Sequence, residues 1–259
     1  MASLNRYLVP GTLACALAAA MTTAFPEEKG KAPVHEWSYA GARGPQHWGD
    51  LKADYAACKT GKTQSPIDIR GAVPADLAPI QFDYHAAPLD IIDNGHTVQI
   101  NYAPGSSISV GGERYELTQF HFHEPSEEKI DGRGYAMVAH FVHKNQEGKL
   151  AVVAVLLKKG GAPNPFIKTL WTHLPKEKEK EQTVAGVSID PTSFLPANHA
   201  YYTFPGSLTT PPCSEGVTWF VLKTPVAVSN AQVARFGKLY SHNARPVQPR
   251  NDRVIRVSK

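Results

Sequence analysis

A series of short apolar segments, separated by turn-forming residues, constrains the fold of this chain more than any other feature. In most of them apolar and polar residues alternate, which is the pattern of a strand with one buried face. The run at 150–157 is apolar almost throughout and is typical of a central strand buried on both faces. The segments lie at residues 67–70, 89–93, 97–102, 108–110, 114–123, 135–143, 150–158 and 217–226.

Two further segments have a helical pattern, at 164–173 and 229–240, and Ser229 is a suitable N-cap for the second. The chain contains 20 Gly and 21 Pro, which favours many turns and short strands over a helix bundle. We therefore predict a mainly β fold, α+β by content, with short helices at its edges.

The length and charge of the chain indicate how many domains it has and which kinds of partner it can bind. A chain of 259 residues can bury a sizeable core, and without an internal repeat or a convincing linker one domain is the better prediction. The formal net charge of +4 is too small and too dispersed to indicate nucleic-acid binding. The charged run KEKEKE at 176–181 is typical of a solvated surface segment.

The first residues have the layout of a secretory signal peptide at 1–24. One basic residue, Arg6, precedes a long uncharged run rich in Leu and Ala, and small residues follow. A membrane anchor is the alternative, but Pro10 and Gly11 interrupt the run. We expect a loose leader at 25–34, a catalytic domain at 35–259, no stable membrane span after cleavage, and a periplasmic or secreted protein.

Export changes how the cysteines are interpreted. Removal of Cys15 with the signal peptide leaves Cys58 and Cys213, an even pair in an oxidising compartment. One disulfide is therefore the first expectation, and two buried free thiols are the alternative.

Two histidines separated by one phenylalanine stand out in QFHFHEPSEE, residues 119–128. Side chains alternate between the two faces of an extended chain, so His121 and His123 share one face while Phe120 and Phe122 share the other. This is the geometry that two ligands of one metal ion need.

A second predicted strand brings His140 and His143. Three neutral imidazoles with an open fourth position are the ligand set of a catalytic zinc. Spacing alone does not decide which of the two is the third ligand, because residues three apart on a strand point to opposite faces.

A cupin metal site is a rival interpretation. The order His121-x-His123-x3-Glu127, followed by Gly134, is close to the first cupin motif, in which the glutamate binds the metal. Tyr115 stands where that motif expects a glycine, and the sequence lacks a convincing second motif.

Taken together, six sequence blocks resemble the α-class carbonic anhydrases, and they occur in the order of that family over nearly the whole chain after the leader. The resemblance implies a large, twisted, mostly antiparallel sheet, a conical zinc cleft, and reversible hydration of carbon dioxide to bicarbonate and a proton. The blocks are GPQHW at 44–48, QSPIDI at 64–69, NGH at 94–96, QFHFH at 119–123, HFVH at 140–143 and GSLTTPP at 206–212.

The resemblance assigns the zinc ligands to His121, His123 and His140. It implies that Glu127 does not bind metal but accepts a hydrogen bond from Thr209, so that Thr209 can only accept one from the zinc-bound hydroxide and thereby orients it.

Other positions match the substrate pocket and the proton path. His96 matches the family's proton shuttle, a role that suits an imidazole with an unperturbed pKa near 6.5. The residues that match the pocket for carbon dioxide are Val142, Val152, Leu208, Thr210 and Trp219.

Hydrogen-bond partners of the ligands also follow from the resemblance. Gln119 matches the side-chain acceptor of His121, and His123 is expected to donate to a backbone carbonyl near Asn243. The resemblance also implies a disulfide between Cys58 and Cys213, and cis peptide bonds before Pro66 and Pro212.

Around the third ligand this sequence departs from the best-known family members. Those members have a glutamate, a histidine and a tyrosine at the positions of Val138, Glu128 and Phe204. We hypothesise that Glu128 accepts the proton of His140 and that Phe204 fills the space of a hydroxyl no longer needed. The alternative is that Glu128 is only a solvated turn residue.

The expected partners are carbon dioxide and bicarbonate, together with sulfonamide or anion inhibitors; a homodimer is compatible with the sequence. The strongest competing function is a catalytically inactive, carbonic-anhydrase-like binding protein. Such relatives typically lack a ligand histidine, whereas all three are present here.

Overall fold

The computed structural model describes residues 36–259, so the predicted signal peptide and leader lie outside the described residues. Within the described part of the chain, no helix is long and apolar enough to cross a membrane.

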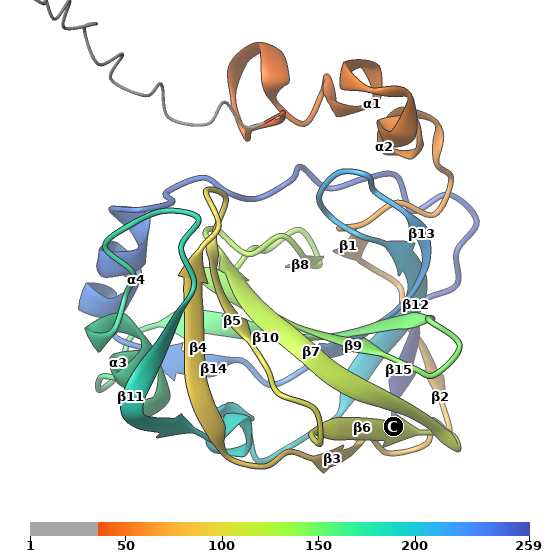
Figure 1. The fold of residues 1–259 in the computed structure, drawn as a ribbon. Helices are drawn as coiled ribbons and strands as arrows, with labels where there is room; N and C mark the ends of the chain where they lie inside the picture. The colour runs from red at the N-terminus through yellow and green to blue at the C-terminus, as the bar shows by residue number, and fades with distance from the viewer. Residues whose placement is uncertain (1–35) are drawn as a thin grey trace, which may run out of the picture. The chain divides into compact units, whose positions relative to one another are not determined.

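A mixed sheet dominates the described residues, as Figure 1 shows. It contains 13 strands. Its main path runs β11-β4-β5-β7-β9-β10-β13-β12-β15-β2, with β3, β6 and β14 attached beside it. Most neighbouring strands are antiparallel, as expected, but β10 pairs in parallel with β13 and β14, and β15 with β2. The strands are β2 (Val73–Ala75), β3 (Gln81–Asp83), β4 (Ala87–Asp93), β5 (Val98–Asn101), β6 (Ser107–Val110), β7 (Glu113–His123), β9 (Met137–Lys144), β10 (Leu150–Lys159), β11 (Gln182–Ile189), β12 (Tyr201–Ser207), β13 (Glu215–Leu222), β14 (Val226–Val228) and β15 (Arg256–Ser258).

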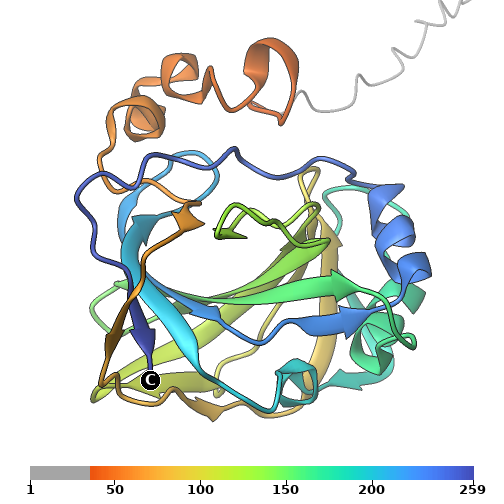
Figure 2. The ribbon, with the colours of Figure 1, turned by 180° about the vertical axis from the view of Figure 1, so that it is seen from behind.

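A separate two-stranded parallel sheet joins β1 (Asp68–Ile69) to β8 (Lys129–Ile130). The helices are short: α1 (Trp48–Leu51), α2 (Ala57–Thr60), α3 (Pro165–Thr172) and α4 (Asn230–Gly237), with 3-10 turns η1 (Gly41–Arg43), η2 (Ala53–Tyr55) and η3 (Pro191–Phe194). Figures 1 and 2 show α3 and α4 together beside β11 and β4.

Both predicted helices are confirmed. Asn164 caps α3 by accepting a hydrogen bond from the N–H of Ile167. Ser229 caps α4 as predicted, in a reciprocal capping box with Gln232. The second helix ends at Gly237, short of its predicted end at residue 240.

The strand alternation separates two apolar clusters. Phe120, Phe122 and Phe141 lie in the larger core, together with α3 and α4 side chains. The opposite face of β9, β10 and β13 contributes Val138, Val152 and other residues to a second cluster. The histidines that alternate with the phenylalanines therefore point to the side of this second cluster.

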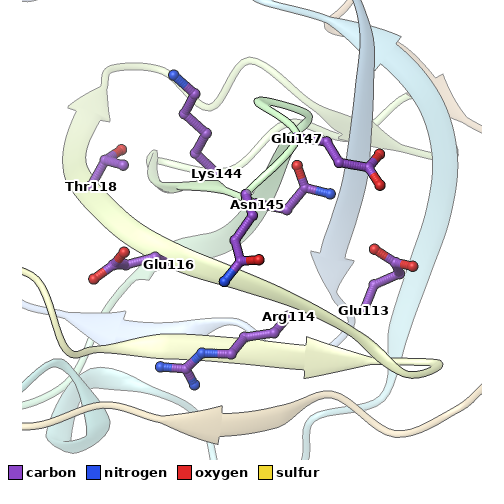
Figure 3. A pocket seen from close by; sticks show the side chains of 8 residues that line it. Glu113, Arg114, Glu116, Thr118, Lys144, Asn145 and Glu147 are labelled. Atoms are coloured by element: carbon purple, nitrogen blue, oxygen red, sulfur yellow. The ribbon is translucent and has the colours of Figure 1, made fainter.

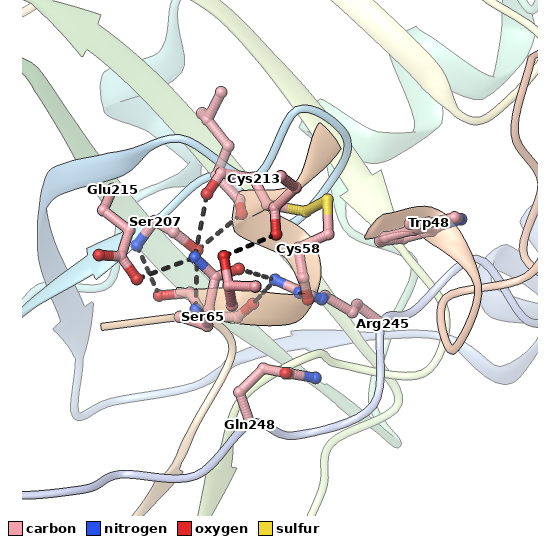
Figure 4. The surroundings of a disulfide bond; sticks show 12 residues. Trp48, Cys58, Ser65, Ser207, Cys213, Glu215, Arg245 and Gln248 are labelled. Atoms are coloured by element: carbon pink, nitrogen blue, oxygen red, sulfur yellow. Dashed lines mark hydrogen bonds between the residues drawn. A yellow bond between two sulfur atoms is a disulfide. The ribbon is translucent and has the colours of Figure 1, made fainter. Parts of the chain in front are cut away.

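The predicted disulfide between Cys58 and Cys213 is present, with an S–S distance of 2.09 Å. Figure 4 shows it beside Arg245 and Trp48. The predicted cis bonds Ser65-Pro66 and Pro211-Pro212 are also present, and Glu124-Pro125 is cis as well.

Candidate metal centre

The register between β7 and β9 brings three histidines together. His121 is the direct Cα partner of His140 across the antiparallel pair, and His123 lies one repeat further along the same face of β7. One ring nitrogen from each lies within 4.8 Å of the others. Among residues 36–259 this is the only group of three or more histidine, cysteine or acidic residues that meets this criterion.

His143 is not part of this group. It is fully buried on the other face of β9, where its Nε2 lies 2.8 Å from the Tyr84 hydroxyl. Burial lowers the pKa of His143 to about 3. The choice that spacing left open is thus decided by the faces of β9: His140 joins the cluster, and His143 belongs to the core.

His121 and His123 each use one ring nitrogen for a hydrogen bond to the protein. His121 Nδ1 lies 2.8 Å from Gln119 Oε1, and His123 Nδ1 lies 2.6 Å from the backbone oxygen of Asn243. A carbonyl oxygen can only accept, so each Nδ1 carries the proton and each Nε2 keeps a lone pair. His123 Nε2 is buried without a hydrogen-bond partner.

His140 is held through its other nitrogen. Its Nε2 lies 3.0 Å from Glu128 Oε1 and 3.3 Å from Oε2, which leaves Nδ1 for the cluster. Glu128 is fully buried, so it is not a solvated turn residue. Val138 and Phe204 are buried in the second apolar cluster, and Phe204 stacks on Trp219.

The charge states of His121 and His123 suit a metal site. Burial lowers the pKa of His121 to about 3 and that of His123 well below its usual value, so both imidazoles are neutral near pH 7. Burial also disfavours the charged form of His140, but the carboxylates of Glu128 and Glu127 outweigh it and raise the pKa of His140. Each of the three imidazoles turns one nitrogen toward the others, and that of His123 has no hydrogen-bond partner in the protein. Three such nitrogens fit a tetrahedral zinc with one open position.

Glu127 lies beside the cluster and is buried. Its Oε1 accepts a hydrogen bond of 2.7 Å from the backbone N–H of Arg245. Its Oε2 has no hydrogen-bond partner and lies 3.5 Å from His123 Nε2 and 3.8 Å from His140 Nδ1. Burial raises the pKa of Glu127 to about 7, while Thr209 and the N–H of Arg245 act to lower it.

His96 lies in a tight turn and lines a hollow that none of the three clustered histidines lines. Its ring stacks on Trp37, with centroids 3.6 Å apart and planes at 7°. The hollow has a volume of about 470 Å³, and Tyr240 and His242 also line it.

The predicted pocket residues form an apolar row beside the histidines. Val142, Val152 and Trp219 are successive Cα partners across β9, β10 and β13. Leu208 packs against the same cluster, and Thr210 follows it in the loop that leads to Cys213. His140 pairs with Ala154, so the row begins one pleat repeat from the third histidine.

A charged hollow of about 440 Å³ lies elsewhere, at the far end of β7 and the turn after β9 (Figure 3). None of the predicted site residues lines it. Its lining is Glu113, Arg114, Glu116, Thr118, Lys144, Asn145, Gln146 and Glu147.

Two residues of the site were missed in the sequence. Arg245 contacts Glu127 across a separation of 118 residues, and no spacing pattern indicates such a contact. Trp37 lies just after the predicted leader, and nothing in its neighbourhood marks it as a partner of His96.

Comparisons with known proteins agree with this arrangement. The family model described as eukaryotic-type carbonic anhydrase matches residues 43–259. A carbonic anhydrase from Nostoc sp. is 43% identical over 230 residues, which cover 87% of each chain.

Solved structures are similar as well. A hyperthermostable carbonic anhydrase from a hydrothermal vent chimney has 48% identity and a TM-score of 0.83, with 86% of this chain and 100% of that chain covered. The Thermovibrio ammonificans α-carbonic anhydrase, solved with the inhibitor sulfanilamide, has 44% identity and a TM-score of 0.82 over 86% and 98% of the two chains. With the fold, the histidine cluster and these matches in agreement, the chain belongs to the α-class, or eukaryotic-type, carbonic anhydrase family.

Proposed function

We propose that the protein catalyses the reversible hydration of carbon dioxide to bicarbonate and a proton, with zinc held by His121, His123 and His140. One observation carries this proposal: three imidazoles, two of them buried and that of His121 partly buried, each hydrogen bonded to the protein through one nitrogen, turn the other toward a common centre beside an apolar row. Zinc bound there lowers the pKa of a coordinated water to near 7, a known property of this enzyme class.

Glu127 and Thr209 orient the attacking oxygen in this proposal. An ionised Glu127 can only accept hydrogen bonds, so the hydroxyl of Thr209 gives it its single proton. The oxygen of Thr209 must then accept from the nucleophile, which turns a lone pair toward the substrate. The burial of both residues supports this role, because water cannot easily replace either partner.

The apolar row binds carbon dioxide, a molecule without net charge. Val152 and Trp219 are almost fully buried, while Val142 and Leu208 keep some exposure and form the accessible part of the wall. Attack of the oriented oxygen on the carbon would give bicarbonate, which would then leave the pocket.

His96 carries the released proton to buffer in this proposal. Its turn places it at the edge of a hollow, stacked on Trp37 and outside the histidine cluster. Imidazole can both accept and release a proton near neutral pH, which suits it to this step.

We also propose that the catalytic unit spans residues 35–259 and that the protein is exported, with cleavage near Ala24. The signal-like sequence at 1–24 and the disulfide support export, because disulfides persist in oxidising compartments. Mass spectrometry of the mature protein from a periplasmic or secreted fraction tests this, and an intact Met1 in that fraction would contradict it.

Sulfonamide inhibition is expected by analogy with the sulfanilamide complex of the Thermovibrio ammonificans enzyme.

Stopped-flow measurement of carbon dioxide hydration tests the proposed activity. The purified protein should accelerate hydration, lose the activity to a zinc chelator, and recover it when zinc is added back. An inactive protein with full zinc content would instead support a binding function.

Glu127→Gln separates the two metal-site interpretations. The variant should keep its zinc and lose roughly 100-fold in turnover, because the hydrogen bonds that orient the nucleophile are altered. Loss of zinc from this variant would indicate that Glu127 is a metal ligand, as in a cupin.

A further inference from the structure

The side chain of Asn243 joins the turn that carries His96 to the strand that carries two zinc ligands. Its Nδ2 donates to the backbone oxygen of His96 at 3.1 Å and to that of Phe122 at 2.9 Å. Its Oδ1 accepts from the N–H of Glu124 at 2.8 Å. Phe122 lies between the two ligands of β7, so the amide bridges the proposed shuttle and the metal centre.

These contacts leave the amide of Asn243 one orientation. The NH₂ group has two protons and finds two backbone carbonyls, while the oxygen finds a backbone N–H. The side chain is almost fully buried, with 2% of its surface exposed, so water does not compete for these bonds. The backbone oxygen of the same residue accepts from His123.

The turn that carries His96 is itself closed by hydrogen bonds. Asn94 Oδ1 accepts from the N–H groups of His96 and Thr97, at 3.1 and 3.0 Å. The Thr97 hydroxyl donates to the backbone oxygen of Phe122. The turn therefore behaves as one unit, and Thr97 and Asn243 fix where this unit stands relative to β7.

We propose that the side chain of Asn243 is a positioning residue for proton release: it sets the separation between the metal centre and the imidazole of His96. The inference rests on the proposed shuttle role of His96. Without the amide the carbonyl of His96 loses its anchor, and the turn can shift on β7. Proton transfer over bridging water depends on heavy-atom separations of about 3 Å at each step, so a small shift slows it.

Two kinetic constants separate this role from a general structural one. At saturating carbon dioxide and low buffer concentration, kcat includes the release of the proton, whereas kcat/KM reports the attack on carbon dioxide. In Asn243→Ser, kcat in dilute buffer should fall about tenfold and recover with added imidazole, because a diffusing base replaces the displaced one. The kcat/KM and the zinc content should remain within about twofold, because the acceptor of His123 is a backbone atom that the substitution retains.

The controls are His96→Ala, the double variant and Asn198→Ser, an equivalent change on the exposed residue Asn198. In dilute buffer, kcat of the double variant His96→Ala/Asn243→Ser should be no lower than that of His96→Ala alone. The kcat of Asn198→Ser should equal that of the unaltered protein. If Asn243→Ser does not fold, Asn243→Asp keeps the acceptor for Glu124 and removes the donor to His96, and the same kinetics apply.

Three results would overturn the inference. An imidazole-sensitive loss in His96→Ala with unchanged kcat in Asn243→Ser would leave the shuttle intact and refute the role of Asn243. A parallel fall of kcat, kcat/KM and zinc content would assign Asn243 a structural role only. Full activity of His96→Ala in dilute buffer would refute the shuttle itself, and the inference with it.

Discussion

Glu128, in the loop between β7 and β8, provides a carboxylate acceptor for His140, the third of the proposed ligand histidines. It is fully buried and 3.0 Å from His140 Nε2, whereas Val138, on the strand of His140 itself, is apolar. A buried carboxylate makes the imidazole a stronger donor of its lone pair and fixes which nitrogen carries the proton. Phe204 has no hydroxyl that could form a hydrogen bond with Glu128 or His140, and its ring packs on Trp219.

Removal of the Glu128 carboxylate should therefore weaken zinc binding. In Glu128→Gln the zinc affinity, measured by competition with a chromophoric chelator, is expected to fall about tenfold or more. Glu124→Gln is the matched control, because Glu124 lies nearby and, among the described residues, the charges that act on its carboxyl are those of Lys159 and His242 and not those of the proposed ligand imidazoles. Unchanged affinity in both Glu128→Gln and Glu128→Ala would contradict this role.

At the residue scale, sequence was informative where a strand period or a family motif applied. The period of two placed His121 and His123 on one face, but the choice between His140 and His143 needed either the resemblance or the strand register. The contact of Arg245 with Glu127 could not be predicted, because it depends on how distant loops pack.

At the scale of elements, Gln232 joins the N-termini of α3 and α4. Its Oε1 accepts from the N–H groups of Ser229 and Asn164, at 3.0 and 2.9 Å, and its Nε2 donates to the oxygen of Asn164 at 2.7 Å. Asn164 in turn caps α3. One buried amide therefore holds two helices that cover the larger core.

Replacement of the Gln232 amide should lower the free energy of unfolding more than the loss of one helix-capping hydrogen bond does. Gln232→Leu leaves the backbone N–H groups of Ser229 and Asn164 without this acceptor, whereas the oxygen of Asn164 still accepts from the N–H of Lys168, and we expect the free energy of unfolding to fall by roughly 2–4 kcal/mol. Ser229→Ala removes one capping bond and should cost only about 1 kcal/mol. Urea unfolding of both variants measures this, and equal losses would show that the bridge between the helices adds nothing.

The strands that the sequence predicted have either an alternation of apolar and polar residues, such as β7, or a continuous apolar run, such as β10. It missed β12, because Pro205 and Gly206 look like a turn, yet they lie inside a strand paired with β13 that shifts register between Gly206 and Ser207. It missed β11, where Gly186 has a positive φ of 72° within an irregular register. Turn-forming residues can mark a bulge as well as the end of a strand.

At the scale of the whole molecule, buried neutral histidines make the fold sensitive to acid. The pKa of His143 is about 3 in the folded protein and near 6.5 in an unfolded chain. Between these values the unfolded chain binds one more proton than the folded protein. The contribution of His143 to the free energy of unfolding is therefore fully present above pH 6.5 and declines as the pH falls toward 3. The slope from this residue is at most about 1.4 kcal/mol per pH unit.

The contribution of His143 can be isolated by comparison with His143→Gln. Glutamine cannot titrate in this range but can still bond the Tyr84 hydroxyl, so the stability of the variant should fall less steeply between pH 6 and 4. Urea unfolding at a series of pH values measures both slopes. Parallel slopes would mean that the acid sensitivity arises from other groups, such as His121 and His123, whose pKa values burial also lowers.

The hydrogen bonds that His123 and Glu127 make with the main chain of Asn243 and Arg245 have a consequence for the order in which a new chain matures. All three proposed ligand histidines emerge from the ribosome about a hundred residues before the segment that completes their surroundings. Until that segment arrives, His123 lacks its backbone acceptor and Glu127 lacks its main-chain donor. A partly synthesised chain that contains all three histidines is thus expected to hold zinc poorly, so we expect metal loading late in biogenesis.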